Sequence, residues 1–233
     1  LCEGEEVNFV ENTQTQYVHS FIWEILANTY NYNPTLVFDS AGELPIKLTL
    51  FNDSTTCYSS LTDTIFINEN PIANAGVDIM VCEKDSFVLS AIGEGSFLWN
   101  GVYLNKELFL CADSTQEFEL LVTDSNGCQS LDNVLVDVQP LPKIHVIGEF
   151  SLCFGDSLHL QSFDNSFYQW GGDFISNEFN VKPISSYSIS VGKYSEANCY
   201  NEKIFEVEVF DTNSIELIKP SVICEKEEFT IDI

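Results

Sequence analysis

Residues 81–90 read VCEKDSFVLS, and residues 152–160 read LCFGDSLHL. These two stretches contain Cys82 and Cys153, and Cys224 follows Cys153 at the same interval at which Cys153 follows Cys82. Self-similarity at a fixed period is the signature of tandem repeats, each of which forms one structural unit. The chain is therefore interpreted as an array before any single residue is given a role.

The match between repeats extends to a second cysteine and a tryptophan. Cys128 follows Cys82 at the same interval at which Cys199 follows Cys153. Trp99 and Trp170 also follow the first cysteine of their repeats at equal intervals, in the similar strings SFLWNG and SFYQWGG. Because a buried tryptophan on a central strand is typical of immunoglobulin-like sandwiches, we expect both tryptophans in a core.

The first repeat is a longer variant. Cys2 opens it, and the intervals from Cys2 to Trp23 and from Cys2 to Cys57 both exceed the corresponding intervals in the other repeats. The last stretch, SVICEKEEFTIDI, repeats only the opening of a unit, so we expect the chain to be a segment of a longer polypeptide. Short linkers that contain proline separate the units. The predicted domains are residues 1–70, 71–140, 141–212 and the start of a fourth repeat at 213–233.

The secondary-structure signal is β-strand throughout. Apolar residues alternate with polar ones in IKLTLFN (46–52), EFELLVTD (117–124) and FEVEVFD (205–211), which is the period of a half-buried strand. No window predicts an amphipathic helix. The fold class is therefore all-β, as a tandem array of small Ig-like antiparallel β-sandwiches.

The cysteines predict one disulfide in each repeat. A domain of this size buries only about 60% of the surface of its unfolded chain, and a disulfide closing a loop of about 47 residues adds roughly 4 kcal/mol. Zinc is the alternative, but it favours short Cys-x-x-Cys spacings, and none occurs. The predicted pairs are Cys2–Cys57, Cys82–Cys128 and Cys153–Cys199.

Two cysteines fall outside that scheme. Cys224 is expected to pair with a cysteine beyond the end of the segment. Cys111, in the strand-like string LFLCADS, is expected to be a free, buried, small apolar residue. Stable disulfides indicate an oxidising compartment outside the cytosol.

The charge balance excludes two classes of partner. The formal net charge is −27, and all nine basic residues are lysine. Nucleic acid and anionic membranes attract clustered Lys and Arg, so neither is an expected partner. The acidic surface is interpreted as a solubility coat. Ca²⁺ bound between modules is the alternative, although no EF-hand-type calcium loop occurs, and no other cofactor is expected.

No catalytic constellation stands out. The three histidines, His19, His145 and His159, lie apart from any Ser or Cys and Asp set that could form a nucleophile–base pair. No phosphate-binding glycine loop or HExxH motif occurs. Carboxylates are abundant, but a glycosidase pair needs a concave site, for which small sandwiches offer little room. We therefore expect no enzymatic activity, no catalytic residue and no metal site.

Several strings together resemble one family. PIANAGVDIMVCEKDSFVLSA (71–91), FELLVTDSNGC (118–128) and VLVDVQPLP (134–142) resemble the tandem repeats of very large surface proteins of Bacteroidota. The greatest similarity is to gliding-motility adhesins exported by the type IX secretion system. The first repeat, at residues 20–52, resembles a PKD-type β-sandwich, although it lacks the Gly-Asp-Gly usual after the Trp strand. The resemblance implies an extracellular location at the cell surface.

One short motif is over-represented. Eight of the fourteen Asp residues are followed directly by Ser or Thr. Turn chemistry explains such pairs, because Asp and Ser side chains bond to their own backbone. The family resemblance implies a second use, O-glycosylation of Ser or Thr in this motif. The matching positions are Ser40, Ser54, Thr64, Ser114 and Ser157.

These observations predict a non-catalytic stalk segment of a large cell-surface adhesin involved in gliding motility and surface attachment. Its expected partners are neighbouring repeats of the same chain, with surface polysaccharide or the motility machinery as further candidates. The alternative is a spacer or carbohydrate-binding module of a secreted polysaccharide-degrading enzyme.

Overall fold

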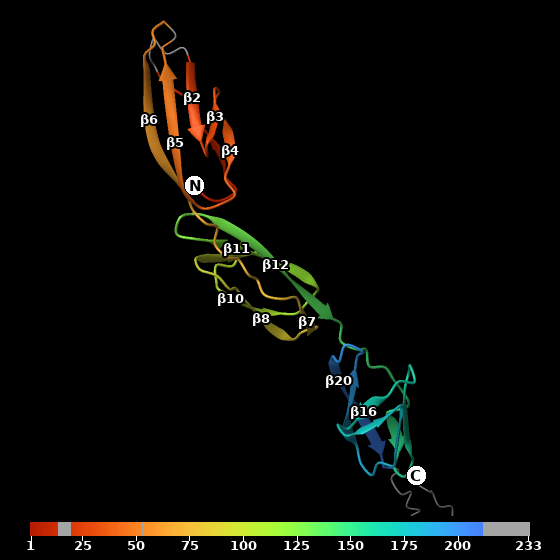
Figure 1. The fold of residues 1–233 in the computed structure, drawn as a ribbon. Coiled ribbons are helices and arrows are strands. Elements are labelled where there is room, and N and C mark those ends of the chain that lie inside the picture. The colour runs from red at the N-terminus through yellow and green to blue at the C-terminus, as the bar shows by residue number, and fades with distance from the viewer. Residues whose placement is uncertain (14–19, 53, 212–233) are drawn as a thin grey trace, which may run out of the picture. The chain divides into compact units, whose positions relative to one another are not determined.

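The computed structural model describes residues 1–13, 20–52 and 54–211, and all twenty regular elements in them are β-strands (Figure 1). The chain divides into two compact units, Leu1–Val138 and Gln139–Ile233. Repeats one and two lie in the first unit and repeat three lies in the second. Among the described residues, no helix is long and apolar enough to cross a membrane.

Repeat one is a sandwich of a two-stranded sheet, β1-β4, and a four-stranded sheet, β3-β2-β5-β6. Both sheets contribute to one apolar cluster, which includes Val7 and Leu36 from the small sheet and Trp23 and Ile25 from the large one. The strands are β1 (Glu6–Asn8), β2 (Ser20–Ile25), β3 (Asn28–Tyr30), β4 (Thr35–Val37), β5 (Gly42–Phe51) and β6 (Tyr58–Ile67).

Repeat two has the same two-plus-four plan, with sheets β10-β8 and β7-β12-β11-β9. Its core joins Phe87 and Leu108 of the small sheet to Trp99, Leu120 and Val134 of the large one. The strands are β7 (Ile79–Cys82), β8 (Ser86–Ser90), β9 (Ser96–Trp99), β10 (Glu107–Cys111), β11 (Gln116–Thr123) and β12 (Gln129–Gln139).

Repeat three is larger by one strand in each sheet, with the orders β13-β15-β18 and β14-β20-β19-β16-β17. Its core contains Leu158, Leu160, Trp170, Val191 and Val207. The strands are β13 (Val146–Ile147), β14 (Ser151–Cys153), β15 (Leu158–Ser162), β16 (Tyr168–Trp170), β17 (Phe174–Ser176), β18 (Glu178–Val181), β19 (Tyr187–Tyr194) and β20 (Tyr200–Phe210).

The alternating sequence pattern explains these sheets. In β11, Phe118, Leu120 and Val122 point inward and are 2% exposed or less, whereas the residues between them are not fully buried. Side chains of a strand alternate between its two faces, so one face of each sheet is apolar and packs against the other sheet. The predicted tandem Ig-like sandwich fold is confirmed, and so is the burial of Trp99 and Trp170, which are 0% and 1% exposed.

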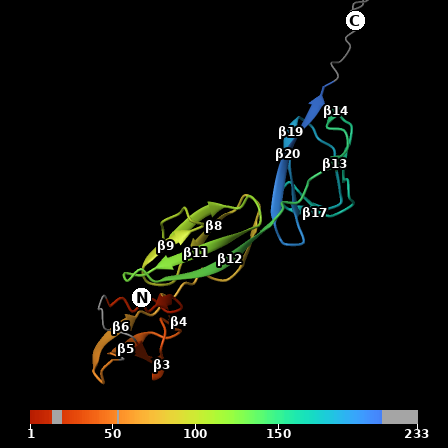
Figure 2. The ribbon, with the colours of Figure 1, turned by 90° about the horizontal axis from the view of Figure 1, so that it is seen from above.

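The three repeats share one strand plan. In each, the strand that carries the tryptophan (β2, β9, β16) pairs with the next-to-last long strand (β5, β11, β19). That strand forms a hairpin with the last strand (β6, β12, β20). Figure 2 shows β11 beside β12 in repeat two, and β19 beside β20 in repeat three. The exact boundaries at 70, 140 and 212 stay predictions, and the predicted fourth repeat lies outside the described residues.

Candidate functional site: the disulfide that joins two repeats

The first cysteine of each repeat opens the same four-residue turn. Its carbonyl oxygen accepts a hydrogen bond from the N–H three residues later, and the third residue has a positive φ. We call Cys2, Cys82 and Cys153 the turn cysteines. Their carbonyl oxygens accept from the N–H groups of Glu5 (3.2 Å), Asp85 (3.0 Å) and Asp156 (3.1 Å), in that order. The third residues, with positive φ, are Gly4, Lys84 and Gly155. A type II turn requires a positive φ at this place, so the repeats share a backbone conformation as well as a sequence pattern.

The second cysteine of each repeat lies in the hairpin before the last strand. We call Cys57, Cys128 and Cys199 the hairpin cysteines. In each case the carbonyl oxygen of the cysteine accepts a hydrogen bond from a residue at the end of the preceding strand. The N–H groups belong to Asn52 (3.1 Å), Asp124 (3.0 Å) and Ser195 (2.8 Å).

In repeats one and three, the two cysteines lie at opposite ends of the last strand. Cys153 aligns with Phe210 at the end of β20, whereas Cys199 immediately precedes β20. Likewise, Cys2 aligns with Asn68, just after β6, whereas Cys57 immediately precedes β6. A strand of ten or eleven residues spans about 33–36 Å at about 3.3 Å per residue, whereas the Cα atoms of a disulfide lie about 4.4–6.8 Å apart.

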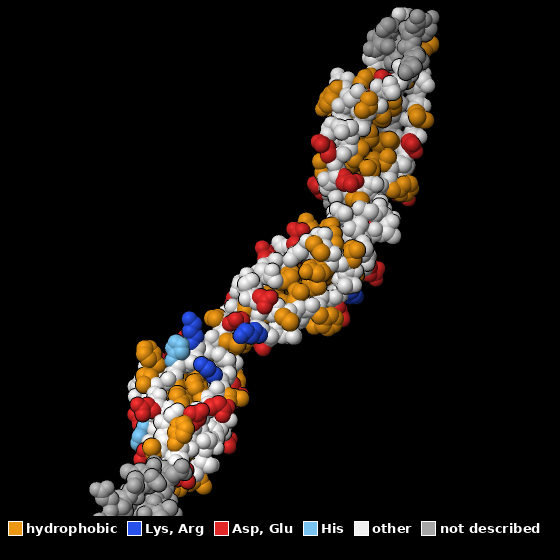
Figure 3. Space-filling view, turned by 180° about the vertical axis from the view of Figure 1, so that it is seen from behind, with side chains coloured by type: hydrophobic (Ala, Val, Ile, Leu, Met, Phe, Trp, Pro, Cys, Tyr) orange, Lys and Arg blue, Asp and Glu red, His pale blue; other side chains and the backbone are white. Residues whose placement is uncertain are grey.

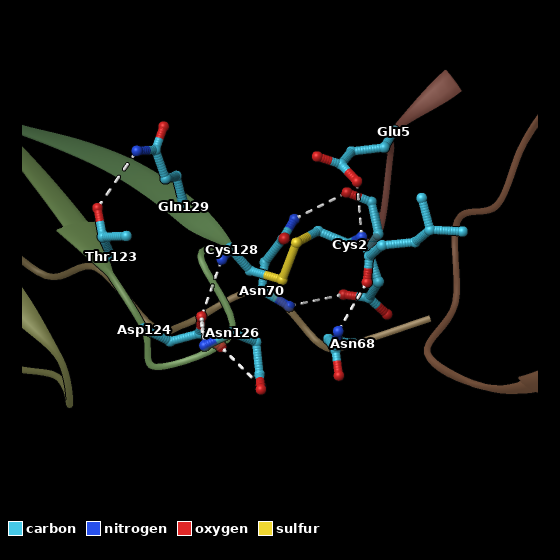
Figure 4. Close-up of a disulfide and its surroundings, with 11 residues drawn as sticks. Cys2, Glu5, Asn68, Asn70, Thr123, Asp124, Asn126, Cys128 and Gln129 are labelled. Carbon is cyan, nitrogen blue, oxygen red and sulfur yellow. Dashed lines mark hydrogen bonds between the residues drawn. A yellow bond between two sulfur atoms is a disulfide. The ribbon is translucent and has the colours of Figure 1, made fainter. Parts of the chain in front are cut away.

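The structure bonds cysteines of successive repeats. Cys2 forms a disulfide with Cys128, with their Sγ atoms 1.96 Å apart, their Cα atoms 5.5 Å apart and a sequence separation of 126. The bond connects the turn of repeat one with the β11–β12 hairpin of repeat two (Figure 4). Cys2 is 8% exposed and Cys128 is 1% exposed, so the bond is shielded from solvent.

Hydrogen bonds hold both sides of this disulfide. On the side of repeat one, the Asn70 side chain donates to the carbonyl oxygen of Glu3 at 3.1 Å, which ties the outgoing chain to the turn. On the side of repeat two, Asp124 Oδ1 accepts from the N–H groups of Asn126 and Cys128, each at 2.8 Å (Figure 4). Both cysteines are therefore fixed by local backbone structure.

The three predicted disulfide pairs are wrong. Cys128 bonds to Cys2 and so not to Cys82, while Cys57 and Cys153 are free thiols. The pairs Cys2–Cys57 and Cys153–Cys199 would have to bridge the length of a sandwich, so neither can form within its folded repeat. Cys82, the turn cysteine of repeat two, and Cys199, the hairpin cysteine of repeat three, are also disulfide-bonded. The equal spacing of the two cysteines in repeats two and three reflects the repeat and not the pairing.

The remaining cysteines have separate outcomes. Cys111 is free, as predicted, but it is exposed rather than buried. It ends β10 opposite Ser86 of β8, where its side chain faces outward, away from the core. The prediction for Cys224 falls outside the described residues.

All five candidate glycosylation residues are exposed. Ser40, Ser114 and Ser157 lie in bends or loops, Ser54 lies in the turn before Cys57, and Thr64 lies within β6. Exposure is the condition that a modifying enzyme needs, and whether any of them carries a glycan stays a prediction.

Repeat three carries a shallow pocket of about 530 Å³. Its lining includes the exposed rings of Phe163 and Tyr194 together with His145, Asp164 and Lys193. Lys193 forms an ion pair with Asp164, and its ammonium lies 5.1 Å from the ring centroid of Tyr168. The hydrogen bond from Lys193, assisted by one from Ser166, holds the pKa of the Asp164 carboxyl well below its usual range.

Within the described residues, no group of three or more His, Cys, Asp or Glu side chains is arranged to hold a metal ion. On the face shown in Figure 3, acidic side chains are scattered among apolar and uncharged ones.

No protein-family model matches the chain, and no curated protein matches it. Among solved structures, it is similar to extracellular domains 3–5 of Drosophila OTK, at 14% identity and a TM-score of 0.32, over 91% of this chain and 93% of that one. It is similar to the insect immune protein hemolin, at 13% identity and a TM-score of 0.35, over 91% of this chain and 72% of that one.

A third similar structure is SGBP-B of the Bacteroides ovatus mixed-linkage glucan utilisation locus, in complex with a mixed-linkage heptasaccharide. The identity is 13% and the TM-score is 0.22, over 94% of this chain and 68% of that one. Because all three TM-scores lie below 0.5, the assignment of the chain to the tandem Ig-like sandwiches rests on its own strand pairing and cores.

Proposed function

We propose that this chain is a non-catalytic stalk segment of a large extracellular adhesin. It projects an adhesive region from the cell surface and transmits force between that region and the cell. The finer assignment, to a gliding-motility adhesin of Bacteroidota with a PKD-type first repeat, follows from the sequence resemblance. On this proposal the segment needs no cofactor, and its partners are neighbouring repeats.

The observation that supports a stalk best is the Cys2–Cys128 disulfide. The bond runs in parallel with the linker between repeats one and two, so two covalent connections cross that junction. Tension on the linker is therefore shared with the sulfur–sulfur bond. A module that only binds a ligand has no need for such a connection to its neighbour, whereas a force-bearing chain gains resistance to being pulled open.

The repeated sequence features agree with a mechanical role. The positions shared by the repeats are the turn cysteine, the hairpin cysteine, the tryptophan and the alternating apolar residues. These residues build cores and junctions. The net charge of −27 makes neighbouring modules repel one another and favours extension, although salt screens that repulsion beyond about 8 Å at physiological ionic strength.

The proposal can be tested in the bacterium that makes the protein. Replacing both Cys2 and Cys128 by Ser should leave export intact and weaken attachment to a surface under flow, since the junction then depends on the linker alone. The matched control is Cys111→Ser, which removes a free thiol and should change nothing. Attachment that stays unchanged in the double variant, at equal surface abundance, would contradict a load-bearing role.

A carbohydrate-binding module is the second candidate, and the pocket of repeat three favours it. Exposed aromatic rings beside a charged pair suit a sugar, because apolar ring faces stack and polar groups orient the hydroxyls. Titration of the chain with soluble surface polysaccharides should show saturable binding that Tyr194→Ala weakens. Ile175→Ala is the control, because Ile175 is also exposed but does not line the pocket.

A further inference from the structure

The turn and hairpin cysteines lie at opposite ends of a repeat. A turn cysteine lies beside the end of the last strand, where the chain leaves the repeat, as Cys2 does beside Asn68. A hairpin cysteine lies where the chain arrives. In repeat two, the incoming residues Asn70 and Pro71 line one pocket together with Asp124 of the hairpin. The outgoing end of one repeat therefore carries a turn cysteine, and the incoming end of the next repeat carries a hairpin cysteine that can bond to it.

We propose that the turn cysteine of every repeat forms a disulfide with the hairpin cysteine of the repeat that follows it. Cys2–Cys128 is one such bond. On this rule, Cys153 is the attachment site for the hairpin cysteine of a following repeat, and Cys57 is the attachment site for the turn cysteine of a preceding one. The partner is a repeat of this same kind, and the result is a chain in which each junction is crosslinked. This inference concerns the assembly of repeats and does not depend on adhesion.

Cys153 presents the same geometry as the bonded Cys2. Both open the shared turn, and both align in parallel with the residue at the end of the last strand. The next residue donates its N–H to that aligned residue in both repeats, from Glu3 to Asn68 at 3.0 Å and from Phe154 to Phe210 at 2.8 Å. Cys153 is exposed and unbonded, so its thiol is available at the outgoing end of repeat three.

The surface around Cys153 is suited to being covered. Phe154 is 55% exposed and Phe210 is 56% exposed, and the two are adjacent through their backbone hydrogen bond. Burial of apolar surface stabilises a complex by about 25 cal/mol per Å². A following repeat that packs on Phe154 and Phe210 would bury these exposed rings and bring its hairpin cysteine close to Cys153.

Cys57 occupies the place of Cys128 in the hairpin of repeat one. Its carbonyl oxygen accepts from Asn52, as that of Cys128 accepts from Asp124, although the loop is one residue longer. Cys57 is exposed and free, whereas Cys128 is 1% exposed within its disulfide. The difference in exposure is what a hairpin cysteine without its partner should show.

Bond formation needs an oxidant, and a small disulfide such as oxidised glutathione supplies it. One cysteine thiolate attacks the glutathione disulfide and releases one glutathione as a thiol. The second cysteine thiolate then attacks the mixed disulfide, forms the sulfur–sulfur bond between repeats and releases the second glutathione. Two protein thiols are oxidised, one disulfide is reduced to two thiols, and the protons pass to those thiols.

The test adds a following repeat with the natural period. Residues 140–210 are duplicated directly after Phe210, so that the added copy follows repeat three as repeat three follows repeat two. Two versions are compared. In one, Cys153 is kept in the first copy and changed to Ser in the second; in the other, the reverse holds. In both, Glu196→Asp in the second copy gives its Cys199 peptide a different mass. After treatment with oxidised glutathione, cleavage at lysine and mass spectrometry identify the linked peptides.

The rule predicts a disulfide between Cys153 of the first copy and Cys199 of the second, and no new disulfide in the other version. A bond within the second copy, or a first-copy Cys153 that stays open to alkylation while the added repeat is folded, would overturn it. Burial of the added tryptophan, read from its fluorescence, shows that the repeat is folded.

The 233-residue chain itself gives a second test that needs no added repeat. In a background with Cys111 and Cys224 changed to Ser, Cys57→Ser and Cys153→Ser variants are mixed in the presence of oxidised glutathione. Each is at about 1 mM, which approaches the effective concentration of linked domains. We expect a disulfide-linked dimer of the two variants through Cys153 and Cys57, since heterologous contacts join unlike ends. Symmetric dimers formed equally well by either variant alone, or no dimer at all, would count against the rule.

Discussion

At the scale of the residue, the three tryptophans are all buried but differ in whether the indole N–H donates a hydrogen bond. Trp99 donates its indole N–H to the Asn105 carbonyl at 3.1 Å, and Trp170 donates to the Ser176 carbonyl at 3.0 Å, in each case six residues later. Trp23 is buried as well, but its indole nitrogen has no hydrogen-bond partner among the described residues. The equal spacing of Trp99 and Trp170 from the first cysteines of their repeats predicted that both are buried. The loops that supply the accepting carbonyls could not be predicted, because the alternation of apolar residues gives no information on loop conformation.

This contrast predicts unequal costs for the same substitution. Trp99→Phe and Trp170→Phe should each lower the free energy of unfolding of their repeat by about 1–3 kcal/mol, because the hydrogen bond from the buried indole is lost and a void is left. Trp23→Phe should cost less, because it also removes an unpaired buried donor. Denaturant unfolding of the three variants measures the difference, and an equal loss in all three would contradict the hydrogen-bond argument.

The Asp164–Lys193 pair predicts a pH dependence. The pKa of Asp164 is lowered in the folded chain by Lys193 and then by Ser166, so the folded state binds a proton there less readily than the unfolded state does. The stabilisation is therefore fully present above the ordinary Asp pKa of about 3.9 and is lost as the pH falls below it towards the folded-state pKa. Lys193→Met should raise the carboxyl pKa, as an NMR titration can follow. Titration of Asp164 near 3.9 in the unaltered chain would refute the assignment.

At the scale of the element, the last strand of each repeat decides the disulfide pairing. The alternating run FEVEVFD (205–211) lies within a long strand that begins directly after Cys199. The strand itself was predictable from that alternation. Its consequence for Cys153 was not, because alternation gives no information on which residue of an early strand aligns with Phe210. Loop-closure arguments favour pairs that are near in sequence, and here the length of a rigid strand overrides them.

The hairpin before that strand gives a test at the same scale. Asp124 Oδ1 accepts from two N–H groups of its own loop, and Ser195 Oγ accepts from the N–H of Cys199 at 3.1 Å in repeat three. Asp124→Ala should destabilise repeat two by about 1–2 kcal/mol and speed amide hydrogen exchange at Cys128. Asp124→Ser should retain most of the protection, because the equivalent loop uses Ser. An equal effect of both variants would show that the side-chain acceptor does not matter.

At the scale of the whole molecule, the Cys2–Cys128 bond joins repeats one and two covalently, in place of the separate closed domains that the cysteine spacing predicted. The self-similarity of the sequence identified the repeats and their fold. The connection between them could not be read from it, because a bond within each repeat and a bond between successive repeats have the same period. Only the opposite placement of the turn and hairpin cysteines in the folded repeat distinguishes the two.

That bond makes a prediction for the stretched molecule. When the chain is pulled from its two ends, the Cys2–Cys128 bond excludes the 126 residues that it spans from extension, even after both sandwiches unfold. Reduction should therefore lengthen the fully stretched chain by at least about 430 Å, at about 3.4 Å per residue. Single-molecule force measurements with and without a reductant test this, and a chain carrying Cys2→Ser, Cys128→Ser, Cys82→Ser and Cys199→Ser should match the reduced form without any reductant. Equal contour lengths before and after reduction would mean that the junction is not crosslinked, and the mechanical argument for a stalk would fail with it.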